Sequence, residues 1–346
     1  MHIRFWSFVL SALPDNSLPR RTQPRTSPFC LRNLLSFAAF AVLACATALA
    51  QARAYSTIIV FGDSLSDTGN VLHLSEDKFG VPVPGPLIPL ENYTLGRFTD
   101  GPDTSPHAVR YFGVWVEQLA AALPGQPLVI NSLDHGTNYA YGFATTANGF
   151  STLSFGINND SVQVENIGQQ ITDYLATNPH IDDYTLFVVW GGATDLLSAT
   201  SPKDVLGAAA RQTLNLQRLI QAGATQFLVP NLPPLGLAPR FNGSPATSVP
   251  ASAASLLFNS YLATGIAILK DFYPRRHLTF YQLDVFNLLL RIVASPGSYS
   301  LTNVKDRAQD LPPTGNPDTY LFWDNLHPTT RGHNILANAA IDLMSH

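Results

Sequence analysis

The chain has 346 residues and a formal net charge of −4; 46% of its residues are hydrophobic and 13% are charged. This length is enough for a large hydrophobic core and one domain of enzyme size. The acidic, mixed charge argues against a protein that binds nucleic acid or an anionic membrane surface.

The first 54 residues are typical of a leader. Arg32 precedes an apolar run over residues 34–44, and small-residue cleavage sites of the A-x-A form end at Ala50 and Ala54. This order predicts a secretory signal peptide at about residues 31–54, and hence a secreted or periplasmic mature protein. Residues 1–29 are rich in Arg, Pro and Ser, which is unusual ahead of such a signal, and we hypothesise an over-extended start site. No later stretch has about 18 consecutive apolar residues, so we expect no integral membrane segment in the mature chain.

Both cysteines, Cys30 and Cys45, lie in this leader. The mature chain therefore has no disulfide, thiolate nucleophile or cysteine metal site. Cys45 faintly resembles a lipoprotein cleavage site, but the apolar run continues past it to a cleaner site, so we do not expect lipidation. Without residues 1–54, which hold 6 of the 20 basic and 1 of the 24 acidic residues, 14 basic and 23 acidic residues remain, a net charge of −9. We expect no nucleic-acid partner.

Strands and helices alternate along residues 55–346, which we expect to form a single domain. Apolar, β-branched segments predict strands at residues 57–61, 128–131, 185–190, 226–230 and 278–283. Helical spacing predicts helices at residues 115–123, 162–176, 203–222, 251–272, 285–293 and 329–344. This alternation is typical of an α/β fold with a parallel sheet covered on both faces. Ligands of such sheets bind beyond the carboxyl ends of the strands.

A strand, a tight turn and a serine follow one another at residues 58–64. We expect Ser64 at the carboxyl edge of the sheet, near the start of a helix that Ser66 or Asp67 caps, where backbone N–H groups favour negative charge. A nucleophile that attacks a carbonyl group suits this place. The alternative is an ordinary strand-to-helix turn in which Ser64 has no chemical role.

Two proline-rich segments, residues 78–113 and 233–250, are predicted to be long loops. Loops of this length in a compact domain are usually functional. Aromatic side chains of the first loop, among them Phe98, would either line the rim of a pocket or pack the loop onto the body of the domain.

Asp324 and His327 lie three residues apart, ahead of Pro328. On a tight turn this spacing places a carboxylate on the imidazole Nδ1–H and leaves Nε2 free to accept a proton from a serine. The alternative is a helix-capping Asp beside an unrelated His. His333 is more consistent with packing or capping. The chain contains no H-x-x-x-H pattern or clustered carboxylates, so we expect neither a metal site nor a cofactor.

Acyl transfer also needs hydrogen-bond donors for the oxyanion that develops on the carbonyl oxygen. The Ser64 N–H is one. Glycine-bearing turns at residues 138–144 and 190–195 follow the second and third predicted strands and would supply the others.

The sequence FGDSLSDTGN at residues 61–70 resembles the first block of the GDSL (SGNH-hydrolase) lipase/esterase family, and Asp324-x-x-His327 resembles its last block. The sequence GRFTDGP at residues 96–102 is similar to a GRF(S/T)(N/D)GP stretch of one subgroup. The resemblance implies a flavodoxin-like three-layer α/β/α sandwich with a five-stranded parallel sheet. It also implies ester hydrolysis through an acyl-enzyme without a cofactor, with Ser64 as nucleophile, His327 as base and Asp324 as the residue that orients it.

Two positions depart from the family pattern. If residues 138–144 align with the family's N-x-A-x-G-G-A block, Phe143 takes the place of the glycine whose N–H serves the oxyanion, with Gly142 as the alternative donor. A phenylalanine disfavours the positive φ that a glycine accepts. In the G-x-N-D block, Thr194 replaces the asparagine and offers one hydroxyl on a shorter arm. We therefore expect a weaker hydrolase that retains its catalytic residues.

The leading hypothesis is an exported serine esterase or lipase-like acylhydrolase that acts on a small-molecule or lipid ester. The runner-up is a non-catalytic binding protein on the same fold with a degenerate oxyanion site. A flavodoxin-like nucleotide binder is disfavoured because the first turn lacks a G-x-G-x-x-G or P-loop pattern.

Overall fold

The computed structural model describes residues 55–80, 96–100, 112–123, 125, 128–154, 160–312 and 314–345. These residues belong to one compact unit, Ala54–His346. The predicted leader lies outside them, as does most of the proline-rich segment between residues 80 and 112.

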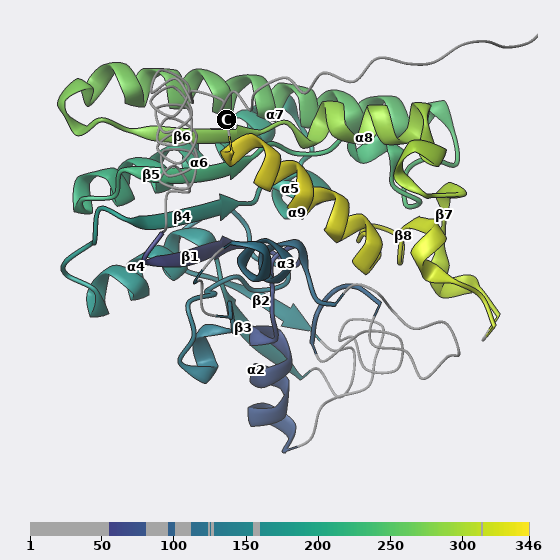
Figure 1. Cartoon of the computed structure of the whole chain (residues 1–346), viewed down its shortest axis with the longest axis horizontal. Helices are drawn as coiled ribbons and strands as arrows, with labels where there is room; N and C mark the ends of the chain where they lie inside the picture. The colour runs from purple at the N-terminus through teal and green to yellow at the C-terminus, as the bar shows by residue number, and fades with distance from the viewer. Residues whose placement is uncertain are drawn as a thin grey trace, which may run out of the picture. The chain divides into compact units, whose positions relative to one another are not determined.

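The main sheet contains four parallel strands in the order β1-β4-β5-β6 (Figure 1). The strands are β1 (Thr57–Gly62), β4 (Thr185–Trp190), β5 (Gln226–Pro230) and β6 (Thr279–Leu283). Every residue of β4 is buried, as expected for a strand that is covered on both faces. The predicted α/β class and these four predicted strands are confirmed.

Residues 137–141, and not the predicted strand at residues 128–131, run beside the free edge of β1. The N–H of Val60 donates to Thr137 O (3.0 Å) and the N–H of Tyr139 donates to Val60 O (2.8 Å), with a single parallel bridge from Val60 to Asn138. The predicted five-stranded sheet is wrong within the described residues, where the sheet has four strands: residues 128–131 form only an isolated bridge from Asn131 to Asn138, and the side chains of Leu128 and Ile130 are exposed. An apolar-strand pattern does not reveal this edge, because the residue that forms the bridge, Asn138, is polar although it is buried.

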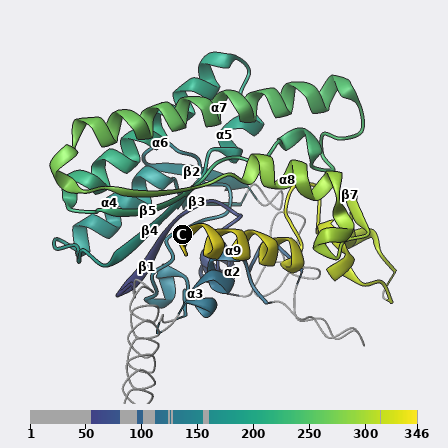
Figure 2. The same ribbon diagram turned by 45° about the horizontal axis from the view of Figure 1, so that its top comes forward.

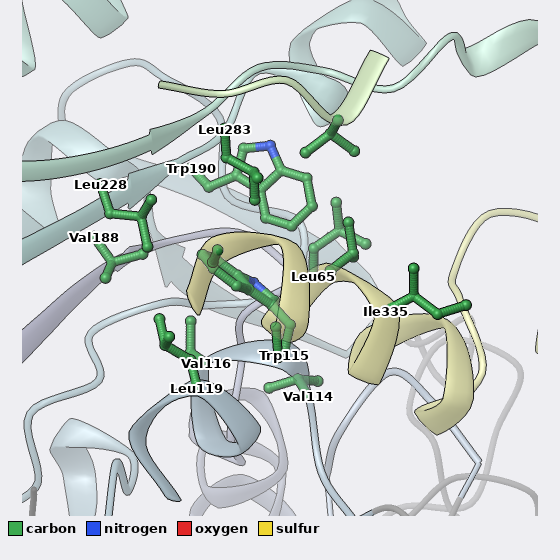
Figure 3. Packing of buried hydrophobic residues seen from close by; sticks show 14 of the residues in the cluster. Leu65, Val114, Trp115, Val116, Leu119, Val188, Trp190, Leu228, Leu283 and Ile335 are labelled. Carbon is green, nitrogen blue, oxygen red and sulfur yellow. The ribbon is translucent and has the colours of Figure 1, made fainter. Parts of the chain in front are cut away.

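Helices cover both faces of the sheet, so the predicted three-layer α/β/α arrangement is confirmed (Figure 2). One face packs against α4 (Ile167–Thr177), α6 (Pro202–Ala222) and α7 (Pro245–Phe272); the other packs against α3 (Trp115–Ala122), α8 (Val285–Ala294) and α9 (Thr330–Met344). On the second face the rings of Trp115 and Trp190 meet edge to face at 5.4 Å, among Leu65, Leu283 and Ile335 (Figure 3). Trp190 ends β4, so this core reaches the carboxyl edge of the sheet.

The predicted helix at residues 162–176 is wrong over its first residues. An antiparallel hairpin, β2 (Phe150–Ser154) and β3 (Ser161–Glu165), precedes α4. Val162 and Val164 are buried while Gln163 is exposed, which is the two-residue alternation of a strand. The helical spacing begins only with Ile167.

Helix α7 begins within the second predicted loop, at Pro245, and includes Pro250. Ser244 followed by Pro245 is a helix-start signal that the prediction passed over. Among the described residues, α7 is the one helix long and apolar enough to cross a membrane. Seven of its residues are buried, among them Phe258 and Leu262 in the core against α6, as in the core helix of a folded domain.

The remaining elements connect these layers. They are α2 (Asn70–Phe79), α5 (Ala193–Ser198), the parallel pair β7 (Asn303–Arg307) and β8 (Tyr320–Phe322), and the short 3-10 helices η1 (Ser132–Asp134), η2 (Leu235–Leu237), η3 (Pro274–Arg276), η4 (Pro296–Tyr299), η5 (Ala308–Asp310) and η6 (Pro317–Thr319). Strand β8 leads directly into the Asp324–His327 segment.

Candidate active site

Ser64 lies two residues beyond the end of β1, in a tight turn. The carbonyl oxygen of Asp63 accepts the N–H groups of Ser66 (3.0 Å) and Asp67 (3.1 Å). Gly62 is required before this turn, because a Cβ there would lie 2.7 Å from the carbonyl oxygen of Trp190. The turn presents the Ser64 side chain, which is partly exposed, at the carboxyl edge of the sheet.

Helix α2 begins six residues after Ser64, so the predicted placement of this serine at a helix start is wrong. The intervening residues are needed for Asp67, whose buried carboxylate accepts the N–H groups of Gly69 (2.8 Å), Asn70 (2.8 Å) and Val71 (3.3 Å). The N-cap position of α2 is occupied by Gly69 and not by Ser66 or Asp67 as predicted, although the Asp67 carboxylate satisfies N–H groups at the start of the helix. Ser66 instead accepts a hydrogen bond from the Trp115 indole through its Oγ (3.1 Å).

Asp324 and His327 form the local pair that their spacing predicts. The imidazole Nδ1 lies 2.7 Å from Asp324 Oδ2, and Asp324 Oδ1 accepts the N–H groups of Leu326 and His327, both at 2.7 Å. The other ring nitrogen, Nε2, lies 2.9 Å from Ser64 Oγ. With Asp324 accepting the Nδ1 proton, the lone pair of Nε2 faces the serine hydroxyl.

The electrostatics of this pair favour an ionised carboxylate beside a basic imidazole. Burial alone would raise the pKa of Asp324, but the charge of His327 and its hydrogen bonds hold this pKa below its ordinary value. Burial alone would lower the pKa of His327, but the Asp324 charge and hydrogen bond, with a smaller contribution from Asp63, leave it raised. The pair is thus arranged to stabilise an imidazolium when the ring takes up a proton.

Asp63 is a second carboxyl group near the imidazole. Burial raises its pKa to about 7, against the opposing effects of the Leu65 N–H and of His327. Its Oδ1 accepts that N–H at 3.1 Å, while its buried Oδ2 makes no hydrogen bond within the described residues. Sequence reasoning missed this group, because nothing in the motif distinguishes a solvated Asp from a desolvated one.

The backbone at residues 142–143 contacts the turn that carries Ser64 and Asp67. Gly142 donates its N–H to Asp67 Oδ2 (2.8 Å), so this N–H is already engaged. Phe143 adopts the left-handed φ of 68° that the family's glycine would accept without cost. Neither the Phe143 N–H nor the Ser64 N–H makes a hydrogen bond within the described residues.

A mostly apolar cavity, open to solvent, is lined by Ser64 and His327. Thr194, at the start of α5, lines it, and its hydroxyl makes no hydrogen bond within the described part of the chain. Apolar side chains form most of the remaining wall, among them Leu197, Leu235, Leu289 and Leu336.

The other predicted features separate from this centre. His333 is fully buried and accepts the Trp115 N–H through Nδ1 (3.2 Å), and burial lowers its pKa to about 3, so it packs in the core. Phe98 contacts the His327 ring, with centroids 5.2 Å apart. In the parts of the chain that the structure covers, no three His, Cys, Asp or Glu side chains gather closely enough to hold a metal ion.

The family model of the GDSL-like lipase/acylhydrolases matches residues 58–340, from β1 into α9. The chain belongs to this family. Among the proteins similar to this chain is one from the trpE-trpG intergenic region of Pseudomonas putida, which is 29% identical over 93% of this chain and 53% of the relative. The thermolabile hemolysin of Vibrio parahaemolyticus is 24% identical over 82% of this chain and 63% of the relative. The phosphatidylcholine-sterol acyltransferase of Aeromonas hydrophila is 28% identical over 83% of this chain and 89% of the relative.

This GDSL-family chain spans only about half to two thirds of the length of the first two relatives. The third relative matches over most of both chains.

Proposed function

We propose that this protein is an exported serine esterase that cleaves carboxylic esters through an acyl-serine intermediate. The observation that carries the proposal is the position of His327, which lies 2.7 Å from Asp324 Oδ2 and 2.9 Å from Ser64 Oγ. A base that is oriented on one side and in contact with a hydroxyl on the other is the arrangement that activates a serine.

In the first step, Ser64 Oγ attacks the carbonyl carbon and His327 Nε2 takes the hydroxyl proton. The imidazolium, held by Asp324, then donates that proton to the leaving alcohol as the ester C–O bond breaks. In the second step, His327 takes a proton from water, the hydroxide attacks the acyl-serine, and the proton returns to Ser64 Oγ as the acid leaves.

The developing oxyanion would accept hydrogen bonds from the N–H groups of Ser64 and Phe143 and from the Thr194 hydroxyl. All three groups lack another partner within the described residues, which leaves them available for this role. Donors fixed before the reaction stabilise the charge without reorganisation. Thr194 presents one rotatable hydroxyl, so we expect this site to be weaker than one with an asparagine.

The leucine-lined cavity is suited to the acyl group of the ester. It is lined by Ser64 and His327, and most of its remaining wall is apolar. Each buried CH₂ group contributes about 0.8 kcal/mol, so longer acyl chains should be favoured over acetate until the cavity is filled.

Export is part of the proposal and rests on the leader: Arg32, the apolar run and the A-x-A sites together form a signal-peptide pattern. N-terminal sequencing of the protein from the culture medium or periplasm tests it, and an intact leader in the exported protein would contradict it.

A second candidate, a non-catalytic ester-binding protein, is favoured by the departures at Phe143 and Thr194. A p-nitrophenyl alkylphosphonate separates the two, because Ser64 Oγ would displace p-nitrophenolate and form an Oγ–P bond. We expect the tryptic peptide with Ser64 to gain the phosphonyl mass, and the Ser64→Ala variant to gain none. Folded protein that stays unmodified would favour the binding protein.

A further inference from the structure

We infer that Phe98 is a positioning residue: its ring fixes the orientation of the His327 imidazole and the conformation of Phe143 relative to each other. This inference rests on the proposed esterase function, since those two groups are the proposed base and oxyanion donor. Among the described residues, Phe98 is not part of the lining of the apolar cavity.

The ring of Phe98 contacts the rings of both His327 and Phe143. Its centroid lies 5.2 Å from that of the His327 imidazole, with the planes tilted by 41°. It also meets the ring of Phe143 edge to face, at 6.0 Å and 76°. It also fills the space over Gly142, where an added Cβ would collide with the ring. Phe98 is only 4% exposed, so water does not separate these contacts.

Phe143 needs such support because of its backbone conformation. A φ of 68° is unfavourable for a residue with a bulky side chain, and it persists only where the surroundings hold it. The edge-to-face contact fixes the Phe143 ring in the geometry that aromatic pairs prefer. In this chain the aromatic contact therefore replaces the conformational freedom that a glycine would provide.

Phe98 can position its neighbours because its own segment, residues 96–100, is held in place by hydrogen bonds and an ion pair on both sides of Phe98. On one side, Arg97 forms an ion pair with Glu117 of α3, with Nη2 2.6 Å from Oε1 and Nε 3.2 Å from both carboxylate oxygens. Both side chains are largely buried, at 14% and 13% exposed. A pair with this geometry holds the backbone more firmly than an exposed one.

On the other side, the segment is bonded to the chain just after His327. Thr99 Oγ1 donates to the carbonyl oxygen of Pro328 (2.9 Å). The carboxylate of Asp100 accepts the N–H of Thr330 (2.5 Å) and its hydroxyl (3.1 Å). The segment thus touches the base, the chain that carries the base, and the oxyanion turn.

The test is a double-mutant cycle with Phe98→Leu, Phe143→Gly and both changes together, assayed on p-nitrophenyl butyrate. Leucine keeps an apolar side chain at position 98 but removes the ring, and glycine at 143 keeps the N–H but no longer needs the ring contact. We expect Phe98→Leu to lower kcat about tenfold or more, with KM changed by less than about threefold. In the Phe143→Gly background the same change should cost at least about threefold less, because only the His327 contact is lost.

Phe280→Leu is the matched control, since Phe280 is also buried and stacks on Phe227 in the sheet, with centroids 4.7 Å apart. Unfolding temperatures of all variants report any general loss of stability. The inference is overturned if Phe98→Leu lowers kcat by the same factor in both backgrounds, or by no more than Phe280→Leu does. A parent protein that hydrolyses no ester and whose Ser64 does not react with the phosphonate would instead overturn the proposed function.

Discussion

Nε2 of His327 lies 2.9 Å from Oγ of Ser64, although 263 positions separate the two residues. Ser64 follows the edge strand β1 and His327 follows β8, which precedes α9. In Figure 1 the arrowheads of β1 and β4 point toward the side of the sheet on which β8 lies. The fold thus brings the segments that carry Ser64 and His327 together at the edge where ligands of parallel sheets bind.

The Asp324–His327 contact predicts how the rate depends on pH. Because the pKa of His327 is raised above its ordinary value of 6.5, kcat/KM should fall as the pH drops through a value above 6.5, where the base becomes protonated. Asp324→Asn removes the charge that supports the imidazolium. We expect this acid limb to move to lower pH and the plateau rate to fall by about 10³–10⁴. An unchanged acid limb in the variant would show that Asp324 does not act on the base.

Asp63 predicts that the stability of the fold decreases as the pH rises, whereas the rate increases. Its pKa rises from an ordinary 3.8 to about 7 in the folded protein, so folding favours its protonated form. The stability it contributes is complete below pH 3.8 and is lost as the pH rises through 7. Asp63→Asn keeps an acceptor for the Leu65 N–H and should be more stable than the parent at pH 8, by roughly 2–4 kcal/mol.

This gain should disappear near pH 4. Urea unfolding at the two pH values measures it, with the exposed Asp271→Asn on α7 as the control. An equal difference at both pH values, or a loss at pH 8, would contradict the burial of an ionisable carboxyl at position 63.

Thr194 predicts a gain of activity by a single substitution. An asparagine at this place reaches further and offers amide donors, while one oxyanion donor is worth about 10²–10³ in rate. We expect Thr194→Asn to raise kcat by about tenfold, and Thr194→Val, of nearly the same shape without a hydroxyl, to lower it. If Thr194→Asn left the rate of p-nitrophenyl butyrate hydrolysis unchanged or lowered it, the account of Thr194 would be wrong.

Leu197 predicts a change in acyl-chain preference. It lines the cavity from α5 and is partly exposed, so a larger side chain narrows the cavity without overpacking the core. Leu197→Phe should lower kcat/KM for octanoate by about tenfold and leave acetate within about twofold. Leu214→Phe on α6, at a position 56% exposed, is the control. Equal effects on both esters would place the acyl chain elsewhere.

Much of the fold can be predicted from patterns among residues that are close together in the sequence. Strands β1, β4 and β5 are mostly buried apolar runs, and the Asp324–His327 pair needs only a three-residue turn. The edge at residues 137–141 was missed because its burial depends on Asn138, whose side chain donates to Ser66 O (2.6 Å). Such a residue is polar in sequence and satisfied only in the folded protein.

The parts of the site that were missed share this long-range character. In the sequence, Phe98 is one of several aromatic residues of a predicted loop. Its contacts with His327 and Phe143, which lie far from it along the chain, form only in the folded protein. The raised pKa of Asp63 depends on burial by residues from distant elements. The φ of Phe143 is positive, a conformation that the aligned glycine of the family would accept and that a phenylalanine disfavours.

The central claim is that Ser64 is a nucleophile. Hydrolysis of p-nitrophenyl butyrate by the protein from Tyr55 onward, beside its Ser64→Ala variant, tests it most directly. We predict turnover by the parent and a loss of at least about 10³-fold in the variant, with both proteins equally folded by circular dichroism. Equal turnover by the two folded proteins would contradict the claim and assign the hydrolysis to another group.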